Sequence, residues 1–237
     1  MALFRPTGSR AAVNNELIAP GDVMAGGENI LAGSLTTAGN GTWTGAMIAT
    51  GIIRRTGPGG GFTDTTDTST NILLALAGNS FSAVMLPGTS FRLRLINTVA
   101  FAHTFAAGAG ILVGTGLLSV AASGFRDYLL TILNASPAIT QQANTVNANP
   151  AITFVLPIGM LALPMGPTPQ AVNITPGMTV SGAGITAGAT VIGVTQGQGG
   201  IIGVTISPSP TATTTAGGTP LTFLPTILID SLGSGTL

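Results

Sequence analysis

Short runs of β-branched and apolar residues, each ended by glycine, proline, asparagine or serine, follow one another along almost the whole chain. The 237 residues include 35 glycines and 15 prolines, and apolar residues with the spacing of a long helix are nearly absent. Strand-like runs at intervals of about ten residues are typical of sandwiches and barrels. The sequence therefore predicts an all-β fold, a β-sandwich or jelly-roll-like domain with an extended N-terminal arm and a small inserted β module.

Changes in composition divide the chain into three parts. Residues 1–61 are expected to form the N-terminal arm with a few strands, and a glycine run at 57–61 marks its end as a flexible joint. Residues 62–164 together with 225–237 are expected to form the sandwich core domain. Residues 165–224 are rich in Gly and Thr, and we expect them to be a small β module inserted before the last strand.

The run over 90–97 shows the clearest strand pattern. Its apolar residues alternate with Arg92 and Arg94, which places the apolar side chains on one face of a sheet and the arginines on the other. Applying the same reasoning to the later runs gives a candidate sandwich core, which consists of Phe91, Leu93, Leu95, Phe105, Tyr128, Leu130 and Ile132.

One short helix and one long loop are expected between the strands. Asp64 and Asp67 precede the apolar run 72–77, so their carboxylates are expected to cap a helix of about two turns. Residues 134–150 contain polar and turn-forming residues and are expected to be a loop.

Charge is scarce throughout the chain. Seven arginines, no lysine and seven acidic residues give a formal net charge of zero and a mean hydropathy of +0.57, whereas about a quarter of the residues in an average soluble domain are charged. Such a surface favours association with other subunits or with lipid.

The most apolar run, 152–165, is shorter than the roughly 20 residues of a membrane helix and contains two prolines. The scattered arginines do not form a nucleic-acid footprint, so we expect neither membrane nor nucleic acid as a partner.

The sequence contains few residues of the types that carry out catalysis. His103 is the single histidine and cysteine is absent, so a catalytic triad or a transition-metal site lacks its ligands. We expect His103 to be a packed strand residue. Asp64 and Asp67 could cleave a glycoside or bind Ca²⁺, although helix capping explains them better. The glycines at 108–116 lack the lysine and the strand-to-helix context of a nucleotide loop. We therefore expect no enzymatic activity, no cofactor and no metal.

Two stretches of the sequence resemble recurring segments of tailed-bacteriophage virion proteins. The first combines the short helix, a strand ending in Asn97-Thr98, an Ala-Ala-Gly-x-Gly turn at 106–110 and the strand Arg126-Asp-Tyr-Leu-Leu130. The second is Gly177-Met-Thr-Val-Ser-Gly, followed by Gly184-Ile-Thr-Ala-Gly-Ala-Thr-Val-Ile192. Its Ala-Thr pair departs from the similar phage motif, in which threonine follows the last glycine directly. Together the stretches cover about half of the chain, and they resemble head decoration (cement) proteins more than tail fibres.

This resemblance implies a non-enzymatic structural protein on the exterior of the phage capsid. Its partners would be the major capsid protein lattice and other copies of the chain, as a homotrimer. The arm would act as the clamp, and the inserted module would face outward or bridge neighbours. A tail-fibre or receptor-binding protein is the first alternative, and an outer-membrane or surface-layer protein is the second. The residues expected to contact the capsid or other subunits are Arg5, Arg10, Arg54 and Arg55.

Overall fold

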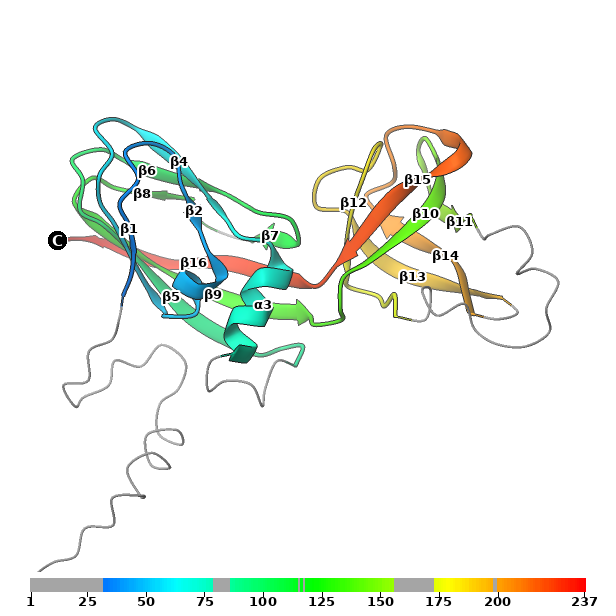
Figure 1. Ribbon diagram of the computed structural model, residues 1–237, viewed down its shortest axis with the longest axis horizontal. Coiled ribbons are helices and arrows are strands. Elements are labelled where there is room, and N and C mark those ends of the chain that lie inside the picture. The colour runs from blue at the N-terminus through cyan, green and yellow to red at the C-terminus, as the bar shows by residue number, and fades with distance from the viewer. Residues whose placement is uncertain (1–31, 79–85, 115, 117, 156–172, 198–199) are drawn as a thin grey trace, which may run out of the picture.

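The computed structural model describes residues 32–78, 86–114, 116, 118–155, 173–197 and 200–237. The described chain is built almost entirely of strands, so the expected all-β fold is confirmed. Two β units lie side by side along the long axis of the molecule (Figure 1). One is a sandwich of two sheets and the other is a closed barrel.

The sandwich consists of a six-stranded sheet and a four-stranded sheet. In sheet A the strand order is β1-β3-β5-β9-β16-β7, and in sheet B it is β2-β4-β6-β8. The strands of sheet A are β1 (Gly33–Leu35), β3 (Ile52–Arg55), β5 (Ser90–Asn97), β7 (Ile111–Val113), β9 (Gly124–Asn134) and β16 (Thr226–Thr236). Those of sheet B are β2 (Thr42–Trp43), β4 (Phe62–Thr66), β6 (His103–Ala106) and β8 (Ser119–Val120).

Successive strands from β1 to β9 alternate between the two sheets. Up to β6, each pair of crossings returns the chain to the same sheet in the same direction, whereas β8 pairs antiparallel with β6. The pairs β1–β3, β3–β5, β2–β4 and β4–β6 are all parallel. In sheet A, β9 is antiparallel to both of its neighbours, β5 and β16. This winding brings residues that are far apart in the sequence into one layer.

The core lies between the two sheets. All seven side chains expected there are buried, and the arginines of β5 point to solvent, as the alternation predicts. Two helices, α2 (Gly45–Ile48) and α3 (Ser69–Gly78), pack on each other and add Ile48, Ile72 and Leu76 to the same cluster.

Residues 33–61 belong to the sandwich rather than to an arm. Strands β1 and β3 lie in sheet A and β2 lies in sheet B. Leu35, Trp43 and Ile53 are buried in the sandwich core. The glycine run at 57–61, expected to be a joint between domains, connects β3 with β4 inside the sandwich. The rest of the expected arm, residues 1–31, lies outside the described residues.

The barrel begins earlier than the module boundary expected at residue 165. It is closed by six strands, in the order β10-β11-β14-β13-β12-β15, around a second apolar cluster that includes Met178 and Phe223. The expected loop 134–150 was wrong, because it contains β10 and the start of β11. The inward residues of β10 are Gln141, Ala143 and Thr145, so no apolar alternation marks the strand. The bounds are β10 (Ile139–Val146), β11 (Asn149–Phe154), β12 (Thr179–Ser181), β13 (Thr190–Gly197), β14 (Gly200–Ser207) and β15 (Thr214–Leu224).

The barrel is inserted between two strands that pair with each other. Asn134, at the end of β9, is the register partner of Thr226, at the start of β16. Both chain crossings between the units therefore occur at one point on the sandwich, where β15 leads into β16 (Figure 1). The sandwich strands do not depend on the barrel for their pairing.

We expect the sandwich to fold without the barrel. Replacing residues 135–224 by Asn-Gly closes β9 and β16 as a hairpin with a short turn, and it keeps Pro225, whose carbonyl accepts a hydrogen bond from Ser69. The deleted chain should unfold cooperatively on heating and should retain the emission of Trp43, which is fully buried. The full chain is the control. A gradual transition with solvent-like tryptophan emission would contradict the independence of the sandwich.

Candidate interaction surface

Most charged side chains of the described residues gather on one face of the sandwich. The outer face of sheet A carries Arg54, Arg92, Arg94, Asp127 and Asp230, which we call the charged face. The chain contains no charged residue between Asp127 and Asp230, so the whole barrel is uncharged. The sandwich therefore has a charged face, whereas the surface of the barrel carries no charged side chain.

An ion pair with two hydrogen bonds lies near the middle of the charged face. Arg94 donates to Asp127 from Nε to Oδ1 at 2.7 Å and from Nη2 to Oδ2 at 2.8 Å. Its guanidinium also lies 4.6 Å from the centre of the Phe125 ring. The hydrogen bonds from Arg94 lower the pKa of the Asp127 carboxyl despite its partial burial, and the charges of Arg94 and Arg92 add to this effect. Asp127 is therefore ionised at neutral pH and holds Arg94 flat over the aromatic ring.

The remaining charges of this face flank an apolar centre. Arg92 on β5 and Asp230 on β16 are both register partners of Leu129 on β9. The side chain of Arg92 is 56% exposed and its Nη2 lies 3.9 Å from Oδ2 of Asp127. Leu129 and Leu228 are partly exposed beside these charges. The face therefore has arginines on β3 and β5, Asp127 and Leu129 on the central strand β9, and Asp230 on β16.

The four arginines expected to make contacts fall into three groups. Arg5 and Arg10 lie outside the described residues. Arg54 is exposed on the charged face, where a contact is possible. The prediction for Arg55 was wrong, because its side chain is fully buried. Adjacent strand residues point to opposite faces, and the sequence does not tell which of the two arginines points inward.

Arg55 is the centre of a buried charge cluster between the two sheets. Its Nε donates to Oδ2 of Asp64 at 2.9 Å and its Nη2 donates to Oδ1 at 3.2 Å. The other guanidinium hydrogens go to main-chain carbonyls, namely those of Leu35, Thr37, Gly39 and Thr56. Every side of the guanidinium thus has an acceptor.

Three further groups lie against the Asp64 carboxylate. Trp43 Nε1 donates to Oδ2 at 3.2 Å, the amide of Gly41 donates to Oδ1 at 2.7 Å, and His103 Nε2 lies 3.0 Å from Oδ2. Burial raises the pKa of the Asp64 carboxyl, but the donors His103 and Trp43 and the charges of His103 and Arg55 outweigh it, so the pKa lies below its usual value. Asp64 is therefore an anion inside the sandwich.

The buried cluster holds the fold together. Arg55, Asp64 and His103 are all 0% exposed, which leaves no space for a substrate beside them. The expectation that His103 is a packed strand residue is confirmed. The expectation that Asp64 caps a helix was wrong, because Asp64 lies within β4.

Asp67 acts at the start of the helix pair. Its Oδ1 accepts from the amide of Thr68 and from Nδ2 of Asn71, and its Oδ2 accepts from the amide of Gly45 in α2. Burial raises the pKa of Asp67, but these hydrogen bonds outweigh it and lower the pKa overall. Asp67 therefore joins the beginnings of α2 and α3.

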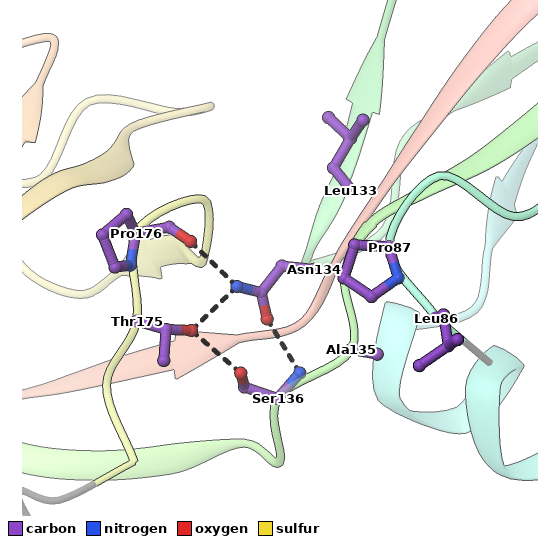
Figure 2. A pocket seen from close by; sticks show the side chains of 8 residues that line it. All are labelled: Leu86, Pro87, Leu133, Asn134, Ala135, Ser136, Thr175 and Pro176. Atoms are coloured by element: carbon purple, nitrogen blue, oxygen red, sulfur yellow. Dashed lines mark hydrogen bonds between the residues drawn. The ribbon is translucent and has the colours of Figure 1, made fainter.

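A groove of about 530 Å³ lies where the sandwich meets the barrel (Figure 2). Nδ2 of Asn134 donates to Oγ1 of Thr175 and to the carbonyl of Pro176, while Oδ1 accepts from the amide of Ser136. The bonds to Thr175 and Pro176 join the end of the sandwich strand β9 to the chain segment that leads into β12 of the barrel. The groove is lined by Leu86, Pro87, Leu133, Asn134, Ala135, Ser136, Thr175 and Pro176, and this lining contains no titratable side chain.

Neither a scan of protein-family models nor searches of the curated proteins and of the solved structures found a match to this chain. Among the described residues, none of the helices has the length and apolar character needed to cross a membrane. The same part of the chain has no group of three or more His, Cys, Asp or Glu residues placed to hold a metal ion.

Removing the buried cation should destabilise the protein strongly. Arg55→Met leaves the Asp64 carboxylate buried without its guanidinium, which should lower the free energy of unfolding by about 3–5 kcal/mol. The matched control is Arg54→Met, which removes an exposed arginine and should change it by about 0.5 kcal/mol or less. The double variant Arg55→Met/Asp64→Leu should recover part of the loss. Urea unfolding measures all three, and equal effects at positions 54 and 55 would contradict the role of the cluster.

Stability should fall in acid because of the same carboxylate. The folded pKa of Asp64 lies below its usual value of 3.8, so the unfolded chain takes up the proton first as the pH falls. The stabilisation is complete above the unfolded pKa and is lost as the pH falls through the folded one. Thermal unfolding between about pH 6 and pH 2 should show this loss. Arg55→Met/Asp64→Leu should lose less, and an equal loss in both proteins would assign the effect to other carboxylates.

Proposed function

We propose that this protein is a non-enzymatic virion structural protein that decorates and stabilises a phage capsid by binding the major capsid protein lattice from outside. The observation that carries the proposal is the separation of a charged sandwich face from a wholly uncharged barrel. A protein that covers a lattice needs a face that contacts neighbouring copies and a neutral exterior, and it needs no reactive groups. The motif resemblance described above supports the same assignment.

The scarcity of charge also fits a subunit that is surrounded by neighbours. A sparsely charged exterior associates readily, and a lattice presents the same contact many times. Modest contacts repeated over a lattice give strong overall binding through avidity. The barrel surface suits the outward position because hydroxyl groups line it; Oγ1 of Thr140 and Oγ1 of Thr222, for example, lie 3.2 Å apart across β10 and β15.

We assign the shell contact to residues 1–31. This segment precedes β1, the edge strand of sheet A, and contains Arg5 and Arg10. The clamp expected over 1–61 is shortened accordingly, because residues 33–61 are needed for the sandwich. If residues 1–31 make the capsid contact, neither the sandwich nor the barrel has to change its fold on binding.

A second candidate is a fibre or receptor-binding component. Val146 and Ile192 on the barrel are 46% and 59% exposed, and exposed apolar side chains can contact a receptor. The two candidates differ in stoichiometry. A lattice-covering protein is present at about one copy per capsid subunit, whereas a fibre is present in far fewer copies.

Binding to expanded capsids of the parent phage tests the proposal. The full chain should sediment with the capsids and saturate near one copy per major capsid protein, measured by quantitative mass spectrometry. Deletion of residues 1–31 should leave a folded protein with greatly weakened binding. Deletion of 1–56 is the contrasting variant and should not fold, because it removes Trp43 and Arg55 from the core.

Three outcomes would overturn parts of this proposal. Saturation at a few copies per capsid would favour the fibre, and no binding by the full chain would reject a decoration role. Unchanged binding after deletion of residues 1–31 would move the shell contact to the folded units.

A further inference from the structure

We propose that the charged face binds the same face of a second copy of the chain, about a twofold axis that lies between the two faces and runs parallel to β9. This inference goes beyond the proposed function and does not depend on it. It rests on the arrangement of three neighbouring strands, β5, β9 and β16, whose outward residues form rows across the sheet.

The first row places opposite charges on the two sides of an apolar residue. Arg92, Leu129 and Asp230 are register partners on β5, β9 and β16. Neighbouring strands lie about 4.8 Å apart, so Arg92 and Asp230 are nearly equidistant from β9 on its two sides. A row with a cation, an apolar centre and an anion is complementary to its own reversed copy.

Symmetry then selects one orientation. A twofold axis along β9 exchanges the β5 side of one copy with the β16 side of the other. Arg92 therefore faces Asp230 of the second copy, twice per dimer, and Leu129 meets its own equivalent across sheets packed about 10 Å apart. An axis across the strands would instead place residues of β5 opposite residues of β5, with Arg92 against Arg92. The charges therefore favour the axis parallel to the strands.

The shapes of the other two rows agree with this axis. Arg94 and Asp127 share a row with Gly233, and Ile96 and Phe125 share a row with Gly235. The exchange therefore places Arg94 opposite Gly233, where a Cβ would meet no atom within 4 Å, and Ile96 opposite Gly235, which the Phe125 ring covers. Asp127 approaches its own equivalent, but its charge is already paired with Arg94 at 2.7 Å. In the Gly233 row a large residue thus faces a small one with open space above it.

A second copy fits this face better than a partner of one charge. A purely acidic or purely basic surface would attract one side of the face and repel the other, whereas a second copy presents the opposite charge to each side. Closed twofold dimers form through one patch that recognises itself, while a threefold ring needs two different patches. Because both charge signs lie on one face, we infer a twofold contact in place of the homotrimer expected from the sequence.

Charge exchange between the two positions tests the contact. In Arg92→Glu the new carboxylate faces Asp230, and in Asp230→Arg the new guanidinium faces Arg92, so each variant alone should have its dimer dissociation constant raised at least about a hundredfold. An equimolar mixture of the two variants should dimerise again, because both contacts in the mixed dimer are between opposite charges. The double variant Arg92→Glu/Asp230→Arg should dimerise by itself for the same reason.

Sedimentation equilibrium provides the measurement, with the wild-type chain expected at twice its mass of 23.4 kDa and circular dichroism confirming the fold of each variant. Arg54→Glu is the matched control, because β7 does not extend to the row that Arg54 would face, and it should leave the dimer intact. A wild-type monomer or trimer would overturn the proposal. It would also be overturned if the single variants remained dimeric, or if neither the mixture nor the double variant restored the dimer.

Discussion

The ion pair between Arg55 and Asp64 is the interaction on which the rest of the sandwich depends. It joins β3 of sheet A to β4 of sheet B, and the carbonyls around the guanidinium fix the loop that follows β1. A buried ion pair is tolerated only when its remaining hydrogen-bonding groups are satisfied. Here Trp43 donates to the carboxylate and His103 lies 3.0 Å from it, so four strands and one loop must be placed correctly before the pair becomes favourable. The pair thereby couples β1, β2, β3 and the loop after β1 to the rest of the sandwich.

The barrel follows a different principle, because its interior is mainly apolar and contains no charge, and its surface is neutral. Its cluster includes Met178, Leu221 and Phe223, and no charge is needed to specify its closure. It is connected to the sandwich through the Asn134–Thr226 pair and the hydrogen bonds of Asn134 to Thr175 and Pro176. A unit attached at one point of a continuous strand pair can differ in surface chemistry without disturbing the sheet that carries it. This separation leaves the charged residues to the sandwich.

The sequence predicts those parts of the fold in which local pattern and burial agree. The alternation over 90–97 identified β5 with its inward side, and the runs after it identified the buried residues of β9. The polar inward residues of β10 hid that strand, because Gln141 and Thr145 are not distinguishable from loop residues by pattern. The charge cluster was hidden for another reason: Asp64 and His103 are brought together by the parallel pairing of β4 with β6, which depends on the alternation of strands between sheets. The charged face likewise needs strand register, which single-strand patterns do not contain.

A chain with so few charges depends on where each of them lies. With a formal net charge of zero, exposed hydroxyl groups supply part of the polar surface, as where Thr63 and Thr104 lie with their Oγ1 atoms 2.7 Å apart on the outer face of sheet B. Charges that are not needed for solubility can instead determine orientation, because a few of them on one face penalise wrong pairings more than the same number scattered over the surface. Arg92 and Asp230 meet this condition, since they flank Leu129 on opposite sides. Low charge content and a specific docking face are therefore compatible properties of one sequence.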